Sequence, residues 1–105
     1  MRELVILDGA IEDFRGIARY IAKRERSTAR GSAFAKRLAD KCAELAASTA
    51  TRGRLRQEFG HDLRCLTFLS YLIFFRYVGD RLEVAAFIHG ARDLAAVFAE
   101  RDRRE

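Results

Sequence analysis

SYLIFFRYVGDRLEVAAFIHGARDL, the stretch from Ser70 to Leu94, decides the fold of this chain. Two apolar runs flank Gly79-Asp80, and a Gly-X pair in this setting is typical of a two-residue hairpin turn. A turn of this length also fixes how the strands pair, because side chains alternate between the two faces of a sheet. The predicted pairs on one face are Tyr77 with Leu82, Phe75 with Val84, Ile73 with Ala86, and Tyr71 with Ile88.

The two faces of this hairpin differ in polarity. The face just described is entirely apolar or aromatic, so we expect helices to cover it. The other face is polar near the turn and apolar beyond it, with the predicted pairs Val78–Arg81, Arg76–Glu83, Phe74–Ala85 and Leu72–Phe87. Its apolar half predicts a patch that a small monomer does not readily leave in water, so either the C-terminal helix or a partner covers it. The residues of this patch are Leu72, Phe74, Ala85 and Phe87.

Two amphipathic helices are predicted ahead of the hairpin. A short apolar run at residues 3–7 fits a first strand, and Asp8 stands where its carboxylate would cap a first helix. Apolar residues at spacings of three and four carry that helix to about Arg24. Ser27 or Thr28 would cap a second helix, whose pattern ends near residue 48.

The remaining elements complete a two-layer arrangement. Residues 63–68 predict a strand that leads into the hairpin, and residues 94–98 begin a last amphipathic helix. The predicted order is β-α-α-β-β-β-α. It favours an α+β two-layer sandwich, with an antiparallel sheet core and the helical hairpin packed on one face.

Composition narrows the class of protein. At 105 residues the chain is expected to form one domain, residues 1–105, with half of its residues hydrophobic and a third charged. The apolar runs are too short to span a bilayer and no signal peptide is present, which predicts a cytoplasmic protein with no membrane contact. Cys42 and Cys65 have no metal-ligand spacing, so we expect reduced thiols, no metal and no cofactor. Residues 15–64 hold thirteen Lys or Arg against five Asp or Glu, a field that attracts polyanions or an acidic partner, unless these are simply solvated helix faces.

Four motifs resemble those of a known family when they are taken together. They are GRLRQE at 53–58, YLIFFR at 71–76, the turn GD at 79–80 and HGARDL at 89–94. In this order and spacing they are similar to the RelE/ParE family of type II toxins. The resemblance implies a small bacterial toxin that forms a hetero-oligomer with a cognate antitoxin, encoded by an adjacent gene and commonly carrying an acidic C-terminal segment.

The resemblance leaves two targets open, because one fold serves both. RelE-like members cleave mRNA on the ribosome with basic and acid–base side chains, and here that role would fall to Arg64 and Arg92. However, Leu72 stands where that branch has an Arg, and Phe98 stands where it has a Tyr. ParE-like members inhibit DNA gyrase by binding, and the HGARDL motif is typical of them. We therefore expect a ParE-like gyrase inhibitor; a ribosome-dependent mRNA interferase and an inactive, toxin-like antitoxin partner are the alternatives.

Binding residues follow from the same motifs. Arg92 is the first candidate for contact with target or antitoxin, and Asp93 beside it is expected to cap the last helix. Arg76 faces Glu83 and is expected to form a cross-strand ion pair. Arg54 and Arg56 are expected to meet acidic groups of the antitoxin or to lie in a solvated loop. The full candidate binding set is Arg92, Arg76, Leu72, Phe74, Phe87, Arg54 and Arg56.

Overall fold

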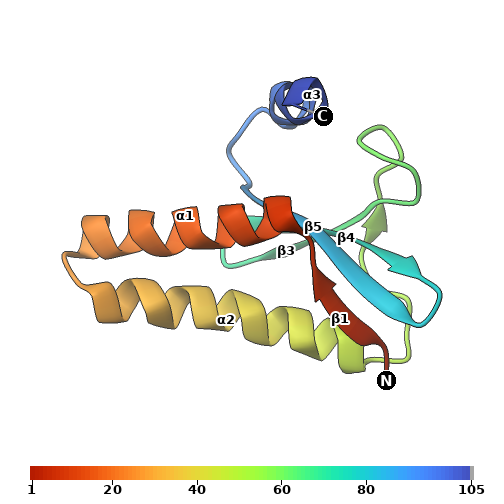
Figure 1. Ribbon diagram of the computed structural model, residues 1–105, viewed down its shortest axis with the longest axis horizontal. Coiled ribbons are helices and arrows are strands. Elements are labelled where there is room, and N and C mark those ends of the chain that lie inside the picture. Colours follow the sequence, from red (N-terminus) through yellow and green to blue (C-terminus); the bar gives the residue numbers. More distant parts are fainter. Residues whose placement is uncertain (105) are drawn as a thin grey trace.

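The helices and strands follow one another largely in the predicted order. The computed structural model describes residues 1–104, with side chains through Arg103. The elements are β1 (Glu3–Ile6), α1 (Asp8–Glu25), α2 (Thr28–Ala47), β2 (Arg54–Leu55), β3 (Arg64–Phe68), β4 (Tyr71–Val78), β5 (Arg81–His89) and α3 (Leu94–Arg104). The α+β sandwich is confirmed, with α1 and α2 on one face of the sheet (Figure 1).

The sheet has five strands in the order β1-β5-β4-β3-β2. β1 runs parallel to β5, so the sheet is mixed, whereas the sequence predicted an antiparallel one. The other pairings are antiparallel. The short strand β2 was not predicted, because two exposed residues carry no alternation that could announce a strand.

Two residues connect the long helices: Arg26 is the C-cap of α1, and Ser27 is the N-cap of α2. Arg26 adopts a left-handed backbone with φ 52°, and its N–H and that of Ser27 return to carbonyls in the last turn of α1. Ser27 then caps α2, as predicted, by accepting the N–H of Arg30 at 3.1 Å. The predicted Asp8 cap is wrong. Leu7 is the N-cap residue, and Asp8 lies in the first turn, where a negative charge favours the helix dipole.

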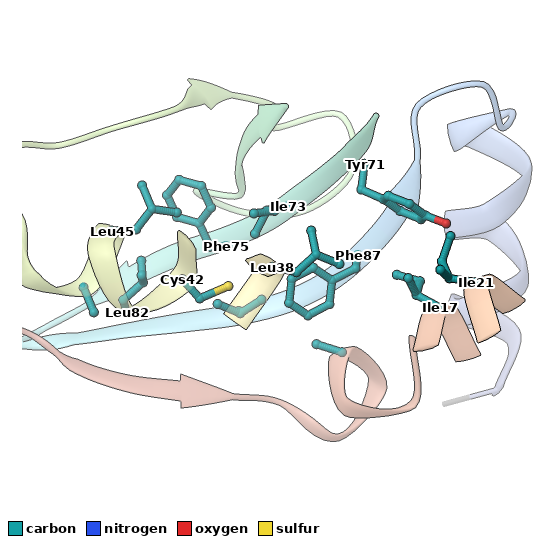
Figure 2. Close-up of a cluster of buried hydrophobic side chains, with 13 residues drawn as sticks. Ile17, Ile21, Leu38, Cys42, Leu45, Tyr71, Ile73, Phe75, Leu82 and Phe87 are labelled. Carbon is teal, nitrogen blue, oxygen red and sulfur yellow. The ribbon is translucent and has the colours of Figure 1, made fainter. Parts of the chain in front are cut away.

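The main core lies between the helical hairpin and the sheet (Figure 2). Ile17 and Ile21 of α1 pack there with side chains of α2, β4 and β5. The largest fully buried members of this cluster are Leu38, Leu45, Ile73, Phe75, Leu82, Val84 and Cys42. Burial of this apolar surface is the main force that holds the helices on the sheet.

A bulge changes the predicted pairing of β4 and β5. The register follows the prediction from the turn as far as Phe75 opposite Val84, and then shifts by one residue. Ala85 is the extra residue, because Phe74 pairs with Ala86 and Ile73 with Phe87. A bulge of this kind sends every later side chain to the opposite face. Phe87 therefore lies in the main core, against Phe14 at a ring-centroid distance of 6.2 Å, and not in the predicted patch.

None of the helices within residues 1–104 combines the length and the apolar character that a bilayer crossing requires.

Candidate binding face of the sheet

The sheet face opposite the helical hairpin carries a second, smaller apolar cluster. It contains Phe74, Cys65 and Ile88 from the strands and Val97 from α3. Phe59, from the segment between β2 and β3, stacks on Phe98 of α3 with a ring-centroid distance of 4.8 Å. The rings of Phe98 and Phe74 pack edge-to-face with a centroid distance of 5.0 Å.

The predicted open patch is therefore closed. Phe74 is 0% exposed, and Leu72 is half-buried against the same cluster. The covering groups are α3 and the segment that carries Phe59, so the chain itself supplies the cover, one of the two alternatives that the sequence left open.

An ion pair holds α3 in this position. The Arg101 guanidinium donates to Oδ1 of Asp13 in α1 at 2.5 Å, and Oδ2 of the same carboxylate accepts the Phe87 N–H at 3.0 Å. Burial raises the pKa of the Asp13 carboxyl, although the Phe87 amide and Arg101 both act to lower it. The start of α3 is fixed by Asp93, which accepts the Ala96 N–H at 3.2 Å and so confirms the predicted cap.

A cleft of about 950 Å³ is lined by residues of α3, of the start of α1 and of the segment around Phe59. Its lining includes the apolar residues Leu63, Ala85 and Ala86 together with arginines and carboxylates. Arg76 and Arg92 both line it, so the structure brings together two of the arginines that the sequence singled out.

The two cleft arginines differ in how they are held. Arg76 donates from Nε to the His61 carbonyl at 3.2 Å. The predicted Arg76–Glu83 ion pair is wrong: the residues are cross-strand neighbours, but Glu83 pairs with Arg81 at 3.2 Å. The Arg92 backbone N–H bonds to the His89 carbonyl, and its exposed side chain has no hydrogen bond or ion pair within the described part of the chain. Arg92 is thus free to meet a ligand.

Arg54 in β2, Arg56 just after β2 and Arg64 in β3 are the arginines of a separate basic segment. Arg56 pairs with Glu58 at 3.0 Å, and Arg64 donates to the Gly53 carbonyl at 3.2 Å. Arg54 is exposed and has no ion pair among residues 1–104. None of the three lines the cleft. The arginines of the predicted binding set are therefore divided: Arg76 and Arg92 line the cleft, whereas Arg54 and Arg56 lie outside it.

The titratable side chains that line the cleft are carboxylates and arginines. Among residues 1–104, those that line it include carboxylates and arginines but no His, Tyr, Lys or Cys. His61 is exposed and meets Asp62 at 3.1 Å, while His89 accepts the Ala91 N–H at 3.1 Å. No three metal-ligating side chains are grouped within that range.

Three residues that build the cleft carry no recognisable signal in the sequence. Asp13 and Arg101 are 88 positions apart, and each lies in a segment that carries many charges. Phe59 lies in a polar segment with no periodicity. Their meeting depends on the direction in which α3 returns across the sheet, which no local pattern encodes.

Comparison with known proteins identifies the class. The helical hairpin and all of the sheet except Glu3 lie within the part of the chain that the family comparison covers. The family model "ParE toxin of type II toxin-antitoxin system, parDE" matches residues 4–94. The chain therefore belongs to the ParE family of toxins of type II toxin–antitoxin systems.

A solved structure shares the fold. It is described as the chromosomal ParDE TA system from P. aeruginosa, and it superimposes with a TM-score of 0.72 over 85% of this chain and 96% of that chain. The sequence identity is 15%, so the likeness concerns the fold. A comparison with curated proteins gave no match. Membership of a toxin–antitoxin family implies a cognate antitoxin as partner.

Proposed function

We propose that this chain inhibits DNA gyrase by binding, with the Arg92 rim of the cleft as the contact. The single observation that carries the proposal is the exposed Arg92 guanidinium, which has no hydrogen bond or salt bridge among the described residues and lines a cleft to which residues 1–103 contribute no His, Tyr, Lys or Cys side chain. Asp13 attracts this guanidinium electrostatically, but a cation without a salt bridge in its own chain can still pair with an acidic group on a partner. Binding needs no acid–base chemistry, whereas RNA cleavage does.

The test is inhibition of gyrase supercoiling by the purified chain. We expect inhibition by the parent protein and at least about tenfold weaker inhibition by Arg92→Ala, since a buried charged contact contributes about 2–5 kcal/mol. Arg37→Ala is the matched control, because Arg37 is an exposed arginine on α2, far from the cleft lining. It should inhibit like the parent.

Three other results would redirect the proposal. No inhibition at high molar excess would reject gyrase as the target. Cleavage of translated mRNA that is lost in Arg64→Ala or Arg92→Ala would place the chain with the ribosome-dependent nucleases. No growth arrest on expression without the antitoxin would favour an inactive partner.

The antitoxin is proposed to cover both charged places. An acidic antitoxin segment would pair with Arg54, which lacks an ion pair among residues 1–104, and would continue towards Arg76 and Arg92. Complementary charge speeds association and is screened by salt. We expect Arg54→Gln to slow association with the cognate antitoxin more at low than at high salt, as measured by stopped-flow fluorescence. An association rate that does not change would reject Arg54 as a contact.

A further inference from the structure

The turn between α1 and α2 carries a dense positive charge that the proposed function does not use. We call residues 19–30 the hairpin tip; Figure 1 shows this turn at the end of the molecule away from β1 and α3. All of the cations of the tip are exposed, and the tip has one acidic residue, Glu25. The cations are Arg19, Lys23, Arg24, Arg26 and Arg30.

The charge of the tip is only partly compensated. Glu25 lies 3.8 Å from Arg24 and 3.4 Å from Arg30. Within the described part of the chain, Arg19, Lys23 and Arg26 have no acidic partner. Arg19 and Lys23 are also four positions apart on one helix, a spacing at which like charges destabilise the helix. The arrangement is unfavourable for the isolated chain and favourable once a polyanion is bound.

The cations of the tip lie beside a groove between two closely packed helices. A groove of about 450 Å³ runs between the helices here, lined by Ala18, Arg19, Ala22, Lys23, Thr28 and Ser32. The helices meet closely beside it because Gly31 has no side chain; a Cβ there would lie 2.4 Å from the Ala18 carbonyl oxygen. Two long helices therefore hold Arg19 and Lys23 in place beside the hydroxyls of Thr28 and Ser32.

We propose that the hairpin tip binds the phosphate backbone of duplex DNA without reading its sequence. Duplex DNA carries one negative charge per about 1.7 Å of its axis, which matches a compact cluster of cations. Single strands are held by stacking on several aromatic rings, and the tip has one ring, Tyr20, which Arg24 already approaches at 5.9 Å.

The same surface fits other polyanions less well. An acidic peptide normally adds apolar anchors to its charges, yet the groove is lined by small and polar side chains. A membrane surface requires Trp, Phe or Leu on the binding face of a helix, and the tip exposes none of these. The inference does not rest on gyrase inhibition, because the tip shares no residue with the lining of the α3 cleft.

The test is titration of a fluorescent DNA duplex with the full chain, followed by anisotropy at several salt concentrations. Five phosphate contacts give a slope of log K against log salt of about −4.5, because each contact contributes about −0.9. The triple variant Arg19→Gln, Lys23→Gln, Arg26→Gln should bind at least tenfold more weakly at low salt and reduce the slope by about 2.7. The double variant Arg19→Gln, Lys23→Gln keeps Arg26, whose backbone is left-handed, and should also bind the duplex more weakly than the parent.

The matched control removes as much charge from elsewhere. Lys36→Gln, Arg37→Gln, Arg103→Gln changes three exposed cations outside the tip and should keep the parent slope. Equal binding by parent and triple variant, with both folded by circular dichroism, would overturn the proposal. So would binding of a poly-glutamate peptide, or of phosphatidylserine-containing vesicles, as tight as that of the duplex. Loss of DNA binding with intact supercoiling inhibition would separate this site from the proposed gyrase contact.

Discussion

Arg101, near the end of the described chain, donates to the carboxylate of Asp13 in the first helix. The same carboxylate also accepts a hydrogen bond from the Phe87 backbone N–H, so the Asp13 side chain joins α1, β5 and α3. This contact fixes the helix that closes the apolar half of the sheet and forms one wall of the cleft.

Loss of this ion pair should loosen α3. Arg101→Gln removes a charge-assisted hydrogen bond from a partly buried carboxylate, so we expect unfolding to become easier by about 1–2 kcal/mol. Urea denaturation measures the change. Arg103→Gln is the control, because its side chain is 74% exposed and its pair should contribute less than about 0.5 kcal/mol. Equal losses in the two variants would contradict the role of Asp13.

The Asp13 carboxyl also predicts a pH dependence. Its folded pKa lies above the ordinary value of 3.8, and burial is the largest cause. The folded state therefore binds more protons than the unfolded state just above pH 3.8, so this group's contribution to stability is lost as the pH rises through that interval. Asp13→Asn should remove this part of the slope in urea unfolding between acidic and neutral pH. An NMR titration that places the Asp13 pKa below 3.8 would contradict the assignment.

Gly31 should tolerate no side chain. A Cβ at this position would meet the Ala18 carbonyl oxygen at 2.4 Å and the Ala22 Cβ at 2.8 Å, so the helices must separate. We expect Gly31→Ala to destabilise the fold by about 1–3 kcal/mol. Gly16→Ala, in the middle of α1, is the matched control, since the nearest atom is the flexible end of Arg19 at 4.0 Å. It should stabilise the helix by about 0.5–1 kcal/mol. Thermal unfolding of both variants gives the comparison.

Phe98 should be needed for the cover of the sheet. It stacks on Phe59 and packs edge-to-face with Phe74, so Phe98→Ala removes two of the three ring contacts of this cluster and leaves the Phe59–Phe74 contact. We expect a loss of about 2–4 kcal/mol, measured by denaturant unfolding. Tyr20→Ala removes an aromatic ring that is 55% exposed and should change the stability by about 0.5 kcal/mol or less. Similar values for the two variants would show that the aromatic cluster does not hold α3.

The thiol of Cys42 should be inert in the folded protein. Burial raises its pKa to about 12, so almost no thiolate forms near neutral pH. We expect no reaction with a thiol reagent until denaturant is added, with absorbance of the released chromophore as the measurement. Cys42→Ala identifies which thiol reacts, because Cys65 remains. Rapid labelling of Cys42 under native conditions would contradict its place in the core.

Local pattern predicted most of the fold. The Gly79-Asp80 turn gave the hairpin and its first four pairs correctly, and apolar spacing gave α1 and α2. The prediction failed at Ala85, because a small apolar residue looks the same in sequence whether it is paired or bulged. The prediction therefore placed Phe87 on the wrong face of the sheet, in the patch with Leu72 and Phe74 instead of in the main core.

The candidate site was less predictable than the fold. Motif spacing singled out Arg92 and Arg76, which the structure brings to one cleft. Asp13, Phe59 and Arg101 were missed, because their contacts join segments far apart in the chain and depend on how α3 returns. Arg76 and Glu83 show the same limit. They are cross-strand neighbours as predicted, but Arg76 donates to a backbone carbonyl and Glu83 pairs with Arg81.

The parallel pairing of β1 with β5 has a consequence for synthesis on the ribosome. Glu3 emerges among the first residues but finds its register partner, Arg81, only after the intervening helices and strands have been made. The entropy cost of joining such distant segments must be met before their contacts stabilise the sheet, which slows folding. A nascent chain without β5 lacks the strand that joins β1 to β4. The complete sheet can therefore form only after β5 has been made.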